Sequence, residues 1–237
     1  MIRNKDSDVL KCLNKELKNY KVKLSFEFYD ECPFKENKIE ILELVLKYVE
    51  SFSSVYNKIF ILSSLCDKFY KDSIPYLVKT YYYFIDEVYK EPIDEIYLIH
   101  ICDTISKINA LEYVDLYEKI ISHSMTQSAE SIIKMLSSMN IERIDDCILK
   151  LIKKENLIPK SWLGTLNEDC KYWCSLVSLK CIVNKRDNKY LALFKELLED
   201  DDMKWIEFTD SKNKYKLVNS LKKQYKLLAK KGMNKIK

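Results

Sequence analysis

The stretch Ile39-Glu-Ile-Leu-Glu-Leu-Val-Leu-Lys-Tyr-Val-Glu-Ser-Phe52 has the pattern that decides the fold class. Its apolar residues recur every three or four positions, which is the spacing that places them along one side of an α-helix. The stripe consists of Ile39, Leu42, Val45, Val49 and Phe52. Ser53 and Ser54 interrupt the pattern, and a second amphipathic stretch continues to about Tyr70. The sequence therefore predicts two consecutive helices here.

The same periodicity continues along the chain. Asp72 and Ser73 open a third helix, with Pro75 tolerated in its first turn, and Asp94 opens a fourth that continues to about Asn109. Further amphipathic stretches cover about 111–123, 128–139, 143–155, 168–184, 188–199 and 213–231. The short connections between these stretches make successive helices antiparallel neighbours.

The composition agrees with an all-α protein. The chain has 237 residues, of which 47% are hydrophobic and 32% are charged, the profile of a folded globular protein. It contains only two glycines, Gly164 and Gly232, and four prolines. Tight β-turns and the strand-to-helix turns of nucleotide-binding folds both need glycine, so neither class of fold is expected.

Pairs of helices recur with a measurable offset. The stretch Phe60–Asp67 aligns with Ile96–Asp103 at an offset of 36 residues, and the apolar positions of 41–48 align with those of 74–81 at an offset of 33. Weaker units follow at 111–139, 143–183 and 190–229. A period between the mid-30s and the low 40s is typical of solenoids built from helical pairs. A globular helical bundle is the alternative fold.

Four segments carry a resemblance to a known family: Cys12–Tyr20, Ile39–Tyr48, Ser73–Val78 and Ser131–Leu136. Together they resemble the HEAT-like (armadillo-type) helical-repeat proteins of low-GC Gram-positive bacteria, and the resemblance covers most of the chain. It implies a single-domain, right-handed α-solenoid of about five antiparallel helix pairs. In that scheme residues 1–38 form an N-terminal helical cap and linker and residues 39–237 form the repeats, closed by a basic capping helix at about 213–231. Proteins of this kind are binding scaffolds without a common activity.

The segment Lys21–Tyr29 alternates polar and apolar residues as a strand does. A single strand has no pairing partner in an α-solenoid. We interpret the segment as an extended linker or as the beginning of the N-terminal cap.

No motif for catalysis is present. The two glycines are too far apart for a phosphate-binding loop, and neither His100 nor His123 stands in a metal-binding pattern. Within an apolar helix, His100 is interpreted as a hydrogen-bonded packing residue, with a catalytic base as the alternative. No catalytic residue, cofactor or metal ligand is therefore assigned.

Four cysteines lie on two neighbouring predicted helices. Cys170, Cys174 and Cys181 share one face of a predicted helix, and Cys147 on the preceding helix is placed to face them. Cys181 would lie about 10 Å along the axis from Cys174, which is too far for one zinc ion. Core packing is favoured, with a metal or redox role as the alternative.

Aromatic residues leave one further possibility open. Residues 81–84 are four consecutive aromatics that project all round a helix, so some are expected in the core and some on the surface. Trp162, Trp173 and Trp205 add further stacking groups. HEAT-type alkylpurine DNA glycosylases use a concave surface of this composition, but the chain shares only their general architecture.

The distribution of charge is uneven. The net charge is +4, and the residues from Ser211 onward include ten lysines and no acidic residue, which leaves −6 on the preceding 210 residues. Lys216, Lys223 and Lys230 are candidate contacts for a partner or for phosphate. They repeat every seven residues, opposite an apolar stripe predicted at Tyr215, Val218, Leu221, Tyr225 and Leu228. A solvated capping helix explains the same pattern without a ligand.

The sequence favours a cytoplasmic, non-enzymatic scaffold that binds another protein, such as an inhibitor or an immunity-type partner of a basic enzyme. This interpretation rests on the acidic body, the absence of a leader or membrane-spanning stretch, and the lack of catalytic motifs. The alternative is a nucleic-acid-binding HEAT-repeat protein related to alkylpurine DNA glycosylases. A small-molecule enzyme is the least favoured class.

Overall fold

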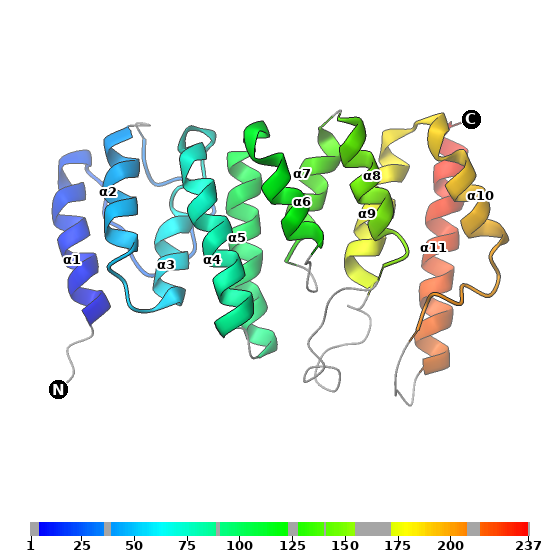
Figure 1. Ribbon diagram of the computed structural model, residues 1–237, viewed down its shortest axis with the longest axis horizontal. Helices are drawn as coiled ribbons and strands as arrows, with labels where there is room; N and C mark the ends of the chain where they lie inside the picture. Colours follow the sequence, from blue (N-terminus) through cyan, green and yellow to red (C-terminus); the bar gives the residue numbers. More distant parts are fainter. Residues whose placement is uncertain are drawn as a thin grey trace. The chain divides into compact units, whose positions relative to one another are not determined.

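The computed structural model describes residues 5–35, 39–88, 91–122, 128–139, 141–154, 172–207 and 214–236. These residues form eleven α-helices and contain no strand, which confirms the predicted all-α class (Figure 1). The chain divides into two compact units, Met1–Leu116 and Tyr117–Lys237. The bounds predicted for a single repeat domain over 39–237 stay a prediction.

The first unit contains the helices α1 (Lys5–Leu17), α2 (Ile39–Val49), α3 (Val55–Ser63), α4 (Ile74–Tyr83) and α5 (Glu95–Ile108), followed by the start of α6 (Val114–Ser122). Consecutive helices from α2 to α5 run in opposite directions and pack against their neighbours (Figure 1). Fully buried aromatic rings such as Tyr70, Tyr81 and Phe84 fill the core between them.

The second unit contains the rest of α6 and the helices α7 (Glu130–Ser138), α8 (Glu142–Leu151), α9 (Trp173–Lys185), α10 (Leu191–Glu199) and α11 (Lys214–Ile236). Helix α9 contacts α7, α8 and α11, so it lies at the centre of this unit, and α10 packs on α11. The central position explains why α9 is buried on most of its surface, from Cys174 to Val183.

The first two predicted helices are shorter than the sequence suggested. Helix α2 ends at Val49, and its first residue, Ile39, is 56% exposed, although the rest of the predicted stripe is buried. The second helix does not reach Tyr70. It ends at Ser63, where the hydroxyls of Ser63 and Ser64 donate hydrogen bonds to the carbonyl oxygens of Phe60 and Ile61, each at 2.7 Å. Serine hydroxyls that bind nearby backbone groups weaken helix continuation.

The predicted linker around 21–29 is neither helical nor a strand. The side-chain amide of Asn14 holds it by bonding to both the N–H and the carbonyl of Leu24, at 2.7 and 2.8 Å. Further along, the Phe28 ring stacks on His100 of α5 with 3.5 Å between the ring centroids. The segment therefore lies against the helices of its own unit. His100 is a packing residue, but its ring stacks on an aromatic neighbour and has no hydrogen bond to a described residue.

The turn between α2 and α3 is held by the carboxylate of Asp6 in α1. It accepts hydrogen bonds from the backbone N–H groups of Ser53 and Ser54, at 2.7 and 2.9 Å, and from the side-chain amide of Asn57, at 2.8 Å. Burial by itself raises the pKa of Asp6, but these hydrogen bonds stabilise the charged form and bring the pKa below its ordinary value of 3.8. We call this set of contacts the Asp6 clasp.

Gly232 explains how α11 approaches α10. A Cβ atom at this position would lie 2.5 Å from two ring carbons of Phe194, and the Phe194 ring is itself buried. The glycine is therefore required by close packing between two helices, a role that the sequence did not indicate.

Replacing Asp6 with Ala should lower the free energy of unfolding by roughly 2–4 kcal/mol, because three donors lose a charged, buried acceptor. The wild-type contribution should be fully present above pH 3.8 and should be lost as the pH falls through the lower pKa of the folded state. Urea unfolding measured between pH 2 and pH 7 tests both statements. The neighbouring Asp8→Ala is the control, since Asp8 pairs with the exposed Lys11 on the surface and the substitution should cost less than about 1 kcal/mol.

Gly232→Ala should lower the free energy of unfolding by roughly 1–3 kcal/mol, because the added methyl group overpacks the contact with Phe194. Helix propensity alone predicts the opposite sign, a gain of about 1 kcal/mol. Thermal or urea unfolding separates the two, with Asn234→Ala on the exposed side of α11 as the control. A more stable Gly232→Ala variant would contradict the close packing described above.

Candidate functional site

A groove of about 310 Å³ opens in the first unit between the end of α2, the start of α3 and the exposed side of α4. We call it the α2–α4 groove. Its lining mixes aromatic, aliphatic and charged side chains: Val49, Glu50, Ser53, Val55, Lys58, Tyr76, Lys79, Thr80 and Tyr83. A hollow of this size with a few polar groups among apolar ones is the usual form of a binding site.

Helix α4 supplies one wall of the groove. The helix begins directly after Ser73, carries Pro75 in its first turn, and buries Leu77, Val78 and Tyr81 against the core. The opposite side therefore faces outward, with Tyr76 at 36% and Tyr83 at 54% exposure. These two tyrosines are seven residues apart, so they lie on the same side of the helix about two turns from each other.

The four consecutive aromatics divide as the sequence analysis expected. Tyr81 and Phe84 are fully buried, Tyr82 is half-buried and Tyr83 is exposed. Helix α4 passes directly into a short π-helical turn over Phe84–Val88. Such turns occur often at functional sites. Only Tyr83 of the four lines the groove.

Glu50 provides the acidic group of the α2–α4 groove. Its carboxylate lies 3.9 Å from the Lys58 ammonium and 3.8 Å from the Lys79 ammonium. These separations are ion pairs without hydrogen bonds, since N–H···O bonds to charged groups measure about 2.7–2.9 Å. The three charged groups therefore keep hydrogen-bonding capacity for a ligand.

The Asp6 clasp fixes the other wall. Ser53 lines the groove and its backbone N–H donates to Asp6, while the Ser54 side chain caps α3 through the N–H of Asn57. The wall is therefore held by α1 rather than left as a free loop. Because rigid sites lose less entropy on binding, this arrangement suits recognition.

The predicted lysine stripe lies on α11. The apolar stripe of this helix and the end of the helix differ in part from the prediction. Lys216, Lys223 and Lys230 are all exposed. The buried stripe of the helix consists of Leu221, Tyr225, Ala229 and Gly232. Tyr215, predicted at the start of that stripe, is 87% exposed, because it stands six residues before Leu221 and so projects about 120° round the helix from it. The helix also extends to Ile236, five residues past its predicted end.

Two other lysines of α11 are engaged within the protein. Lys226 pairs with the carboxylate of Asp201, and Lys222 donates to the Asp201 carbonyl at 3.2 Å. The Lys226 ammonium, the nearest cation, lowers the pKa of Asp201. Asp201 thus meets the flank of the helix and makes no contact with the stripe of Lys216, Lys223 and Lys230 among the described residues.

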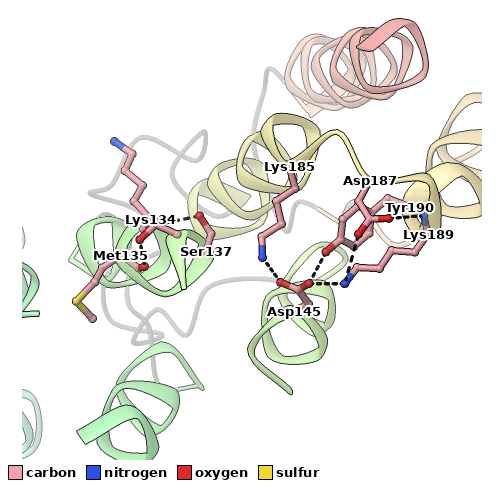
Figure 2. Close-up of polar contacts among 9 residues, drawn as sticks. Lys134, Met135, Ser137, Asp145, Lys185, Asp187, Lys189 and Tyr190 are labelled. Carbon is pink, nitrogen blue, oxygen red and sulfur yellow. Dashed lines mark hydrogen bonds and ion pairs between the residues drawn. The ribbon is translucent and has the colours of Figure 1, made fainter. Parts of the chain in front are cut away.

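The second unit also contains a cluster of charges around the buried carboxylate of Asp145 in α8 (Figure 2). Its carboxylate accepts hydrogen bonds from Lys185, from Lys189 at 2.6 Å and from the Tyr190 hydroxyl at 2.6 Å. Burial raises the pKa of Asp145, but the bonds from Lys185, Lys189 and Tyr190 outweigh it and lower the pKa. Tyr190 is buried, and burial together with Asp145 raises the pKa of its hydroxyl. Both oxygens are already occupied, so the cluster braces α8 against the connection between α9 and α10.

The described cysteines of the predicted group are buried or half-buried. Cys174 and Cys181 are buried in α9, Cys147 is half-buried, and Cys170 and His123 lie outside the described residues. Burial raises the pKa of Cys181, and burial with the nearby Glu118 raises the pKa of Cys147, so both thiols stay protonated. Within the described ranges there is no group of three or more metal-ligating side chains, and no helix is long and apolar enough to cross a bilayer.

Comparison of the chain with protein-family models, with curated proteins and with solved structures found no match in any of the three. Function is therefore inferred from the geometry of the chain itself.

The sequence analysis identified the lysine stripe but not the α2–α4 groove. Tyr76 and Tyr83 share one face of a predicted helix, and that signal was available. The contribution of Glu50, Ser53 and Lys58 was not available in the same way, because these residues precede Tyr76 by 18 or more positions and only the packing of α2 and α3 brings them to α4.

Asp145→Ala should lower the free energy of unfolding of the second unit by roughly 2–4 kcal/mol, because two ammonium groups and a buried hydroxyl lose their shared acceptor. Hydrogen exchange of amides in α8 and α9 would report the loss locally. Asp146→Ala, at the next position of α8, is the matched control. Equal protection in the Asp145 variant and in the wild type would show that the cluster is not a brace.

Proposed function

We propose that this protein binds another protein through the α2–α4 groove, without catalysing a reaction. The observation that carries the proposal is the pair of exposed tyrosines, Tyr76 and Tyr83, on one side of a well-packed helix beside the ion pairs of Glu50. Neither tyrosine hydroxyl has a hydrogen-bond partner among the described residues.

Tyrosine suits this role because it offers a large apolar ring and one polar group while losing few rotamers on binding. Tyrosines are also enriched among the residues whose truncation costs an interface 2 kcal/mol or more. Their spacing of two helical turns fits a partner segment that lies along α4 and meets both rings.

The charge of the first unit indicates the kind of partner. This unit contains 20 acidic and 16 basic residues, and the second contains 16 acidic and 24 basic residues. Beyond Tyr83, the π-helical turn exposes Asp86 and Glu87, and Glu91 is exposed further along. A basic surface would be attracted to this end of the groove. These exposed acidic residues support a basic protein as the partner. An inhibitor or an immunity-type protein of a basic enzyme would have such a partner.

We also propose that the helix pairs are HEAT-like repeats stacked as a solenoid. A recurring local structure supports this proposal. A short 3₁₀ turn that contains a tyrosine precedes α4, α6 and α10, over Lys68–Ser73, Leu111–Tyr113 and Asn188–Tyr190. In each, the tyrosine N–H bonds the carbonyl three residues earlier, and in two of them Asp67 or Asp187 caps the turn.

The test is a pull-down from nuclease-treated extract of the source cells with the wild-type protein and with the double variant Tyr76→Ala/Tyr83→Ala. We expect one protein at near-stoichiometric yield with the wild type and a loss of at least about 30-fold in its affinity for the double variant, since two interface tyrosines are removed. Calorimetric titration of the purified pair measures the loss.

Tyr215→Ala is the matched control, because Tyr215 is an equally large exposed ring on a helix of the second unit. It should bind as the wild type does. Equal capture of the same protein by the double variant would exclude the α2–α4 groove as the binding surface.

A further inference from the structure

The exposed side of α11 is a second surface with a distinct chemistry, separate from the proposed groove. The helix has 23 residues and is anchored by Leu221, Tyr225, Ala229 and Gly232, which pack toward α9 and α10. On the opposite side, Lys216, Lys223 and Lys230 repeat every seven residues. At 1.5 Å per residue they form a nearly straight row about 21 Å long.

These three ammonium groups have no carboxylate partner among the described residues. Lys222 and Lys226 on the flank of the same helix differ from them, because both donate hydrogen bonds to Asp201. The helix thus separates its lysines into two groups. One group, Lys222 and Lys226, contacts Asp201. The other, the row of three, faces solvent without a carboxylate partner among the described residues.

Positive charge also gathers at the end of α11. There Lys235 donates a hydrogen bond to the side chain of Asn184 at 2.7 Å. Partial burial, together with the nearby cations Lys231 and Arg186, lowers the pKa of Lys235. Gathering like charges disfavours the folded state, and a bound polyanion relieves that repulsion.

We propose that the row of Lys216, Lys223 and Lys230 on α11 binds the sugar–phosphate backbone of nucleic acid without reading its base sequence. Lysine ammonium groups are point charges that contact phosphate oxygens from many directions, and the row contains no arginine fork for reading a guanine. Backbone contacts of this kind position a protein on nucleic acid and carry no sequence information.

A membrane surface fits the same helix less well. Helices that lie in a bilayer interface insert an apolar face, but the apolar stripe of α11 is buried inside its own unit. The side that faces solvent offers only one exposed aliphatic residue near the row, Leu227 at 66% exposure. Electrostatic contact with phosphate groups is what this side provides.

Counterion release gives the proposal a quantitative form. Three lysine–phosphate contacts predict that the logarithm of the binding constant falls with the logarithm of salt concentration at a slope of about −2.7 for duplex DNA and about −2.1 for a single strand. From 50 to 200 mM salt, the duplex should therefore bind about 40-fold more weakly.

The experiment is fluorescence anisotropy of the full chain with a 20-base-pair duplex of arbitrary sequence and with one of its strands, each at several salt concentrations. We expect slopes at least as steep as those above for the wild type. In the triple variant Lys216→Gln/Lys223→Gln/Lys230→Gln, the duplex slope should become shallower by about 2.7, and a scrambled duplex should behave as the first one does.

The control is Lys15→Gln/Lys18→Gln/Lys23→Gln, which removes the same charge from exposed lysines of the first unit and should keep the wild-type slope. Circular dichroism confirms that both variants remain helical. The proposal is overturned if the wild type shows no salt-dependent binding, if both triple variants lose the slope equally, or if anionic phosphatidylserine vesicles bind while the duplex does not. Failure here leaves the groove untouched, because the groove lies in the other unit.

Discussion

The carboxylate of Asp6 joins the first helix of the first unit to the turn between its second and third helices. Helices of nine to fourteen residues are too short to be stable alone in water, so each needs its neighbours held at a fixed place. Asp6 joins the beginning of the chain to a turn 47 residues later, and three donors converge on it. Where α3 begins therefore follows from where α1 lies, and the wall of the α2–α4 groove follows from both.

In the second unit a buried aspartate also holds neighbouring elements together, but its hydrogen-bond donors are different. Asp145 is also a buried aspartate, but it draws on two ammonium groups and a phenol in place of backbone N–H groups. In both cases hydrogen bonds outweigh the cost of burial and hold the charged form, so acid weakens both units. Only the Asp145 brace depends on the charge of its partners' side chains.

Much of the helical structure could be predicted because it is local. The stripe of Leu42, Val45 and Val49 and the Ser73–Pro75 start of α4 depend on residues within a turn of each other. The errors have non-local or competing causes. Serine hydroxyls that bind backbone carbonyls end α3 early. Tyr215 is exposed and does not belong to the buried stripe of α11, which begins at Leu221. The Asp6 clasp was invisible in the sequence because two of its three donors are main-chain groups that every residue except proline has.

Because two of the donors are main-chain groups, the clasp places little constraint on the residue types at those two positions. Positions 53 and 54 contribute main-chain N–H groups to the clasp, so many residues there would preserve it, and only proline would remove a donor outright. Position 6 has no such freedom. The turn between α2 and α3 can therefore accept many substitutions at positions 53 and 54, whereas the clasp forms only if position 6 keeps its carboxylate.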